Sequence, residues 1–453
     1  MTAWNKLAFI LVLTIVAFTT LAYGAVHQPV IALTYILIAA GVLCWAVSTL
    51  SSGTLIFSKH PLQLPLLLLG AYALVQIIPF GKIGEAVGQT DIPRTISLEP
   101  FASEATAVHI LFLSAFFAVA LYVLDRAARL RRAVAVLTIF GFAYAFYAIL
   151  QSVLSPDKIY GIYKPQTATP FGSFVNRHDF AAVIEMLIAL PLGMLFTGSV
   201  QRDRRLIYVV AIALMGTSML LSGSRGGLVA LVAEILLLII VTTRARGRSN
   251  VILKVGLSAA LVVTSVGGAI FVGGDTSLTR FASAAAADDP TSSRTQIWAV
   301  TLGVIKHNLP FGAGVGAFSQ AYTKFDTASG FERIEQAHND YLQVLADAGL
   351  VGLLLGFLFL FWFLREGLQN VRVDNAFRRG VATGAFAGCF AILVHSAFDF
   401  VLHITAISLT FLMILAILVA AGRSYDDDFI DVVDERAGRR VKRATVTPIS
   451  ERL

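Results

Sequence analysis

Charged side chains are scarce in this chain of 453 residues. They make up 14% of the sequence, against about 25% in an average soluble domain, whereas hydrophobic residues make up 57%. This composition excludes an ordinary soluble domain and predicts a polytopic membrane protein embedded in a lipid bilayer. The formal net charge of +7 then reflects the topology of the loops and does not indicate nucleic-acid binding.

Cysteine is nearly absent, and metal-ligand spacing is rare. Cys44 and Cys389 both lie in apolar runs, so the sequence offers no disulfide framework and no zinc site. The spacing i, i+4, i+8 of His395, Asp399 and His403 would align them on one helical face. We expect a hydrogen-bonded set there rather than a metal site, and we expect no cofactor.

Long apolar runs dominate what remains. A membrane helix needs about 20 apolar residues, and twelve runs approach that length. They lie at about 7–24, 29–50, 61–79, 105–124, 133–154, 180–197, 206–222, 226–243, 251–273, 349–364, 380–398 and 402–421. We therefore predict an all-α transmembrane domain of about 12 helices over residues 1–424, with one long polar loop at 274–348 and a solvated, disordered tail at 425–453.

The short basic loops assign the two sides of the membrane. Arginines cluster after the fourth, sixth and eighth apolar runs and between the tenth and eleventh, at positions 126–132, 202–205, 244–248 and 365–379. All these loops fall on one side, which the positive-inside rule makes cytoplasmic. We predict that both termini are cytoplasmic and that the loop at 274–348 is extracytoplasmic.

Two outward turns carry arginine. In the segment 170–179, Asn176 or Asp179 can cap the following helix, but capping does not explain Arg177 beside His178, whereas phosphate contact does. Both interpretations remain open there. The turn Ser222–Gly227 is either a glycine hinge with a snorkelling Arg225 or an anion site, and we favour the anion site.

The long loop holds a third arginine and a histidine. Apolar residues at Ile297, Val300 and Val304 predict an amphipathic helix that Ser292 or Ser293 can cap. Arg294 in its first turn opposes the helix dipole, so an anionic ligand explains it better than helix stability does. Gly312–Gly316 lacks the strand–turn–helix context of a dinucleotide site and is a turn. Glu335 and the segment Ala337–Gln343, with His338 and Asp340, close the loop.

Two acids fall inside predicted spans. Glu185 and Glu234 lie in the sixth and eighth apolar runs. An ionisable residue at membrane depth is expensive and is a functional hypothesis by default. For Glu234 a structural and a functional role both remain open, and we predict that it lies near an outward arginine, because its helix follows the Arg225 turn.

These motifs occur in the order of a known family. Phe171–His178, Ser222–Gly227, Ser293-Arg294 with Trp298, Gly312–Gly314 and His338–Gln343 together resemble the O-antigen ligase and polymerase superfamily of bacterial surface-polysaccharide assembly. The resemblance covers about residues 165–365 by motif. It implies a GT-C-like membrane glycosyltransferase that acts on a polyprenyl-diphosphate-linked glycan at the outer face of the inner membrane.

The resemblance also implies residue roles. Arg225 and Arg294 match arginines thought to hold the diphosphate, and His338 matches a loop histidine that assists the acceptor hydroxyl. Arg177 and His178, from the phosphate interpretation of the segment 170–179, are further candidates for the diphosphate site. An imidazole suits a general base near neutral pH, and we expect Asp340 or Glu335 to orient it. The acceptor is either lipid A-core, for a ligase, or a growing polysaccharide, for a polymerase.

Two other classes of protein remain as alternatives. A transporter or flippase of lipid-linked glycans can also have twelve spans, but it should show related halves and polar residues at mid-membrane. A scaffold without catalytic activity gives no reason for three outward arginine sites and His338. The partners that the resemblance implies are the glycan donor, the acceptor and the bilayer.

Overall fold

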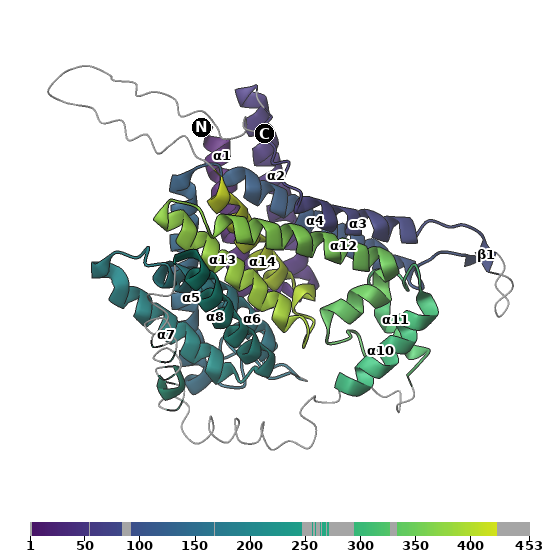
Figure 1. Ribbon diagram of the computed structural model, residues 1–453. Helices are drawn as coiled ribbons and strands as arrows, with labels where there is room; N and C mark the ends of the chain where they lie inside the picture. The colour runs from purple at the N-terminus through teal and green to yellow at the C-terminus, as the bar shows by residue number, and fades with distance from the viewer. Residues whose placement is uncertain are drawn as a thin grey trace. The chain divides into compact units, whose positions relative to one another are not determined.

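Helices make up nearly all of the structure. The computed structural model describes residues 2–53, 55–83, 92–166, 168–246, 294–326 and 333–423, with isolated positions between 256 and 270 (Figure 1). The long helices are α1 (Ala3–Leu21), α2 (Gln28–Ser52), α4 (Pro100–Val123), α5 (Ala127–Leu154), α6 (Arg177–Phe196), α7 (Arg205–Ser222), α8 (Arg225–Arg246), α12 (Asp340–Asn370), α13 (Ala376–His395) and α14 (Thr405–Gly422). Shorter ones are α3 (Gln63–Gln76), α10 (Arg294–Asn308), α11 (Phe318–Thr323) and the 3-10 turns Tyr23–Ala25, Arg202–Arg204 and Val401–His403. One antiparallel pair, β1 (Lys82–Ile83) with β2 (Ile92–Pro93), joins α3 to α4.

Among the described residues, 10 helices are long and apolar enough to cross a membrane. They are the ten long helices above, with α7 counted from Arg202 and α8 to Thr243. The prediction of an all-α polytopic membrane bundle is confirmed, and the chain is a multi-pass membrane protein. The predicted number of twelve is not confirmed, because α3 has only 14 residues and the run at 251–273 lies mostly outside the described residues. The predicted tail at 425–453 lies outside them as well.

Two helices form the centre of the bundle. The most apolar stretches of α6 and α14 are each 94% buried, against 22% for α2. Other helices therefore enclose α6 and α14, whereas most of the surface of α2 faces away from the bundle. Small residues allow α6 and α13 to touch closely: a Cβ added at Gly193 would lie 2.2 Å from the backbone nitrogen of Gly384. This contact fixes the relative position of two helices that begin or end at the site described below.

Helix α12 is broken nine residues after its start, where it contacts the loop between α10 and α11. Gly349 has φ 57° inside the helix, so the segment Asp340–Ala348 points differently from the apolar segment after it. A Cβ at Gly349 would lie 2.2 Å from the carbonyl oxygen of Pro310, and Leu350 donates its N–H to that oxygen at 2.9 Å. The loop before α11 is thereby held against the break, with α10 and α11 beside α12 (Figure 1).

The predicted amphipathic helix exists as α10. Val304 is fully buried, and Ile297 and Val300 pack against the same cluster. Gln76, at the end of α3, ties this outer layer to the bundle: its amide nitrogen donates to the carbonyl oxygens of Phe311 at 2.9 Å and Asp347 at 3.0 Å. Of the predicted loop at 274–348, residues 274–293 lie outside the described residues, including the expected caps Ser292 and Ser293.

Candidate functional site

The two arginine turns at 170–179 and 222–227 contact each other. Asn176 is the N-cap of α6, its side-chain oxygen accepting the His178 N–H at 3.1 Å, which leaves Asp179 in the first turn. The His178 Nδ1 forms a hydrogen bond of 2.9 Å with the Ser224 hydroxyl, in the turn between α7 and α8. A Cβ added at Gly223 would lie 3.5 Å from the Arg177 Nη1, so the guanidinium of Arg177 lies over this turn.

Asp399 connects two further predicted site residues, Arg294 and His338. It lies between α13 and α14, where its Oδ2 accepts from the Arg294 Nη2 at 2.9 Å and its Oδ1 pairs with the His338 Nδ1 at 3.0 Å. Its side chain is only 5% exposed. Burial raises the pKa of the Asp399 carboxyl, but the hydrogen bond with His338 and the nearby Arg294 guanidinium outweigh burial and hold that pKa well below its ordinary value. Asp399 is therefore a carboxylate at neutral pH.

The backbone at His338 is held in an unusual conformation. Its φ is 50°, a region that side chains other than glycine seldom occupy. Hydrogen bonds fix the flanking residues: the Trp298 indole N–H donates to the Ala337 carbonyl at 3.0 Å, and the Asn339 amide donates to the Ala397 carbonyl at 2.9 Å. Strain of this kind persists where the surroundings determine it, and it concentrates at functional sites.

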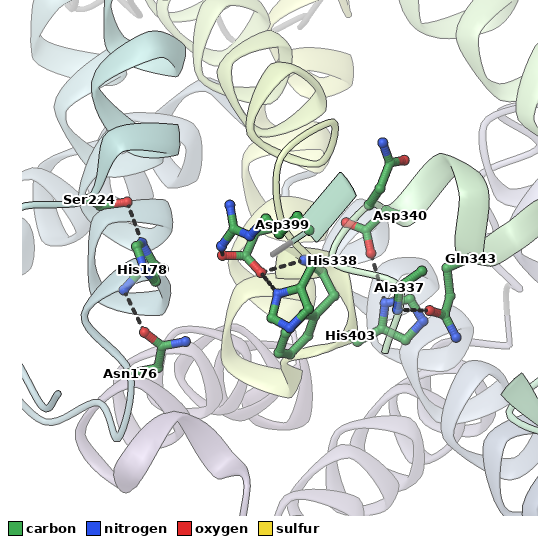
Figure 2. Close-up of polar contacts among 12 residues, drawn as sticks. Asn176, His178, Ser224, Ala337, His338, Asp340, Gln343, Asp399 and His403 are labelled. Carbon is green, nitrogen blue, oxygen red and sulfur yellow. Dashed lines mark hydrogen bonds and ion pairs between the residues drawn. The ribbon is translucent and has the colours of Figure 1, made fainter. Parts of the chain in front are cut away.

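The ring of His338 is oriented on two sides. Asp399 contacts Nδ1, and the Phe400 ring meets the imidazole edge-on with 4.8 Å between ring centroids. The Nε2 atom is therefore the ring nitrogen turned away from Asp399, and 32% of the side chain is exposed. Figure 2 shows His338 pointing at Asp399, with His178 and Ser224 as a separate pair.

The expected partners of His338 need correction. The Asp340 Oδ1 contacts the His403 Nδ1 at 2.7 Å, and its Oδ2 accepts the Leu402 N–H at 3.1 Å. Asp340 begins α12 and faces the 3-10 turn at 401–403, so it anchors that turn instead of orienting His338. Glu335 is exposed. The carboxylate that reaches His338 is Asp399, which sequence reasoning had placed only in the His395–His403 set.

That set does not share one helical face. Helix α13 ends at His395, and each of the three side chains contacts a different segment: His395 pairs with Glu185 at 3.2 Å, Asp399 with His338, and His403 with Asp340. Burial lowers the pKa of His403, but its hydrogen bond with Asp340 and the charge of that carboxylate raise the pKa above the ordinary value. Within the described part of the chain, no group of three or more His, Cys, Asp and Glu side chains is placed to hold a metal ion.

The turns and the Asp399 pairs belong to one electrostatic cluster. The charges of Asp399, Arg177 and Arg294 all act on the imidazole of His178. Arg225, the first residue of α8, is exposed within the turn at 222–227. The structure thus gathers Arg177, His178, Arg294 and His338 from three separate stretches of sequence.

Glu234 has different surroundings from those predicted. It is fully buried, and neither carboxyl oxygen has a hydrogen-bond partner among the described residues. Among the described residues, the charged group that acts on it is Glu185, and no arginine does. Glu234 follows Arg225, the first residue of α8, by nine positions, which places it about 13 Å along the helix, too deep to share the turn.

The fold and these contacts define a class of protein: a multi-pass membrane protein that gathers arginine, histidine and carboxylate side chains at one end of its helices. Residues 210–357 match the family model described as O-antigen ligase, which confirms the resemblance to that superfamily. The match includes Arg225, Arg294 and His338, while Arg177, His178 and Asp399 lie outside it. None of the curated proteins matches the chain.

Proposed function

We propose that this chain is a membrane glycan transferase of the O-antigen ligase type. It transfers a polyprenyl-diphosphate-linked glycan to an acceptor hydroxyl at the outer face of the bacterial inner membrane. The observation that carries the proposal is the bridge made by Asp399, which connects a guanidinium, Arg294, with a partly exposed imidazole, His338. One carboxylate thereby couples a group that binds phosphate to a group that accepts a proton.

The chemistry assigns a role to each group. His338 Nε2 takes the proton of the acceptor hydroxyl, the oxygen bonds to the anomeric carbon, and the bond from that carbon to the diphosphate breaks with its electron pair on the leaving group. The negative charge of Asp399 stabilises the imidazolium that forms, as the carboxylate does in a Ser-His-Asp triad. Asp399 is thus a positioning residue in place of Asp340 and Glu335.

The arginines serve the leaving group. Charge accumulates on the lipid diphosphate as the bond breaks, and fixed guanidinium groups stabilise it. Arg225 lies within the turn at 222–227 and Arg177 lies over it. Arg294 has five N–H donors, of which the contact with Asp399 uses one. His178, fixed by Ser224, adds a further polar contact. A diphosphate is already a good leaving group, so this arrangement needs no metal.

The acceptor decides between two activities within the superfamily. Lipid A-core would make the protein a ligase, and a growing polysaccharide would make it a polymerase. The basic loops at 202–205 and 365–379 lie at the opposite ends of α6, α7, α12 and α13 from the site. By the positive-inside rule, this arrangement supports a periplasmic site and cytoplasmic termini.

Reconstitution tests the proposal and its alternative of another class. Proteoliposomes containing the full chain would receive a polyprenyl-diphosphate glycan and either lipid A-core or a repeat-unit acceptor. We expect a glycosylated acceptor and release of polyprenyl diphosphate with one of the two. Movement of the glycan lipid across the bilayer with neither product would overturn the proposal and support a flippase.

A further inference from the structure

A buried acid–imidazole pair lies beneath the Arg225 turn. Both Glu185 carboxyl oxygens are 3.2 Å from the His395 Nδ1, and both side chains are 0% exposed. Glu185 belongs to α6, eight residues after Arg177, so it lies about 12 Å further along that helix. The transfer chemistry proposed above does not use either residue.

The His395 ring packs directly against the first turn of α8. A Cβ added at Gly226 would lie 2.8 Å from both the Cδ2 and the Nε2 atoms of His395. The next residue is equally enclosed, because a Cβ at Gly227 would lie 2.9 Å from the Ala181 Cβ on α6. The backbone that carries Arg225 therefore rests on His395 and α6 with no space for an additional methyl group.

His395 also adjoins the segment of the base. The carbonyl of the following residue, Ser396, accepts the Asp340 N–H at 2.9 Å, and Asp340 begins the helix that His338 precedes by two residues. The end of α13 thus contacts the arginine turn through a side chain and the start of α12 through its backbone.

Stability alone is a poor explanation for this pair. Taking an acid and an imidazole out of water costs about as much as their mutual attraction returns, and an apolar pair of similar volume is often as stable. A buried hydrogen-bonded pair does, however, fix the rotation of the imidazole ring, which an apolar side chain would not. Gly226 packs against the His395 ring, so the ring that the pair holds in place is the one that supports this turn.

We propose that Glu185 and His395 are positioning residues for the diphosphate site. Glu185 fixes the orientation of the His395 ring, and the ring fixes the first turn of α8 and with it the guanidinium of Arg225. The inference rests on the proposed function. A misplacement of about 1 Å in a reacting group can reduce the rate about 100-fold, so small movements of this turn should be measurable.

A pair of glycine variants tests the packing. Gly226→Ala directs a methyl group into the His395 ring, whereas Gly356→Ala places one on α12 where nothing lies within 4 Å. We expect Gly226→Ala to lower kcat/KM for the polyprenyl-diphosphate glycan about 10- to 100-fold, with a raised donor KM, and Gly356→Ala to leave it unchanged. Thermal unfolding in detergent is measured on both.

Conservative replacement of the acid tests the hydrogen bond. Glu185→Gln retains a polar partner for the His395 Nδ1, whereas Glu185→Leu removes it at similar volume. We expect the glutamine variant to stay within about threefold of wild type in donor KM, and the leucine variant to resemble Gly226→Ala. A merely structural role would lower the unfolding temperature and the amount of active protein without changing the donor KM.

A double-mutant cycle decides whether the effect passes through Arg225. If it does, Gly226→Ala and Glu185→Leu should have little further effect in an Arg225→Ala background, because the effects of substitutions at interacting residues are not additive. Additive losses, or a Gly226→Ala variant that behaves like Gly356→Ala, would overturn the positioning role while leaving the transferase intact. Absence of transfer by the wild-type chain would instead overturn the proposed function.

Discussion

His338–Asp399 and His395–Glu185 are two pairs of the same chemistry in opposite surroundings. In each, an imidazole Nδ1 contacts a carboxylate, at 3.0 Å in the first pair and 3.2 Å in the second. The His338 side chain is 32% exposed and its acid also contacts Arg294, whereas the second pair is 0% exposed. An imidazole that acts on a substrate must be reachable, and one that supports a backbone turn must be enclosed. The comparison therefore favours proton transfer as the role of His338 and support of the turn as the role of His395.

The largest expected effect is on His338. His338→Ala should reduce transfer about 10²–10⁴-fold, which is the usual contribution of a general base, while binding of the polyprenyl-diphosphate donor persists because the arginines remain. Transfer and donor binding are measured on the same preparation. His307→Ala is the matched control, since His307 is an exposed histidine at the far end of α10 and should leave both quantities unchanged. Transfer by His338→Ala near the wild-type rate would remove the basis of the comparison.

Asp399→Asn should have the next largest effect. The amide keeps the shape of the side chain but no longer opposes the charge of the imidazolium or of Arg294, so we expect transfer to fall about 10²-fold or more, by analogy with loss of the triad carboxylate. Asp340→Asn is the control, because Asp340 contacts His403 instead; it should reduce transfer less and lower stability more. If Asp340→Asn were the more damaging to transfer at unchanged stability, Asp340 would regain the orienting role predicted from the sequence.

Arginine geometry should matter more than arginine charge. Arg225→Lys and Arg294→Lys retain a positive charge but lose the planar pair of donors that matches a phosphate, and we expect about a tenfold loss in kcat/KM for the donor. Arg333→Lys provides a control, since Arg333 contacts Ser319 at 2.6 Å in the outer layer. Equal activity of the arginine and lysine proteins would mean that these residues contribute charge alone.

Most of the fold could be predicted from the sequence, because spans follow from local composition. The run predicted at 206–222 corresponds to α7 at Arg205–Ser222, and the one predicted from 349 begins where Gly349 breaks α12. The nine residues before that break are also helical, which apolar length could not reveal. The count of twelve depends on a run at 251–273 that the structure mostly does not describe.

The site was predictable as a set of segments and not as a set of contacts. Asp399 lies 105 positions after Arg294 and 61 positions after His338 in the sequence. Only helix packing brings the three side chains together. Asp340 was the nearest acid to His338 in sequence, yet its carboxylate turns toward His403. The prediction that Glu234 lies near an arginine was wrong for a similar reason, since its helix starts at the arginine turn but carries the side chain away from it. The sequence signal for Asp399 was its spacing with His395 and His403, which predicted contacts within that set and not with His338.

The smallest expected effect concerns pH, and it separates the supporting contacts from the catalytic ones. The pKa of His403 is raised by Asp340, so the folded protein holds that proton more tightly than the unfolded chain, in which histidine titrates near about 6.5. The stability that this pair contributes is fully present below about pH 6.5 and is lost as the pH rises through the folded-state pKa. We expect the unfolding temperature of the detergent-solubilised protein to decline as the pH rises above about 6.5, and His403→Gln to flatten the decline without abolishing transfer.

The Asp399 carboxyl, with its lowered pKa, has the opposite sign: its contribution to stability is present above the unfolded-state value near about 3.9 and is lost only as the pH falls below it. A decline that persists unchanged in His403→Gln would show that the Asp340–His403 contact adds nothing to stability, and Asp340 would then need another role.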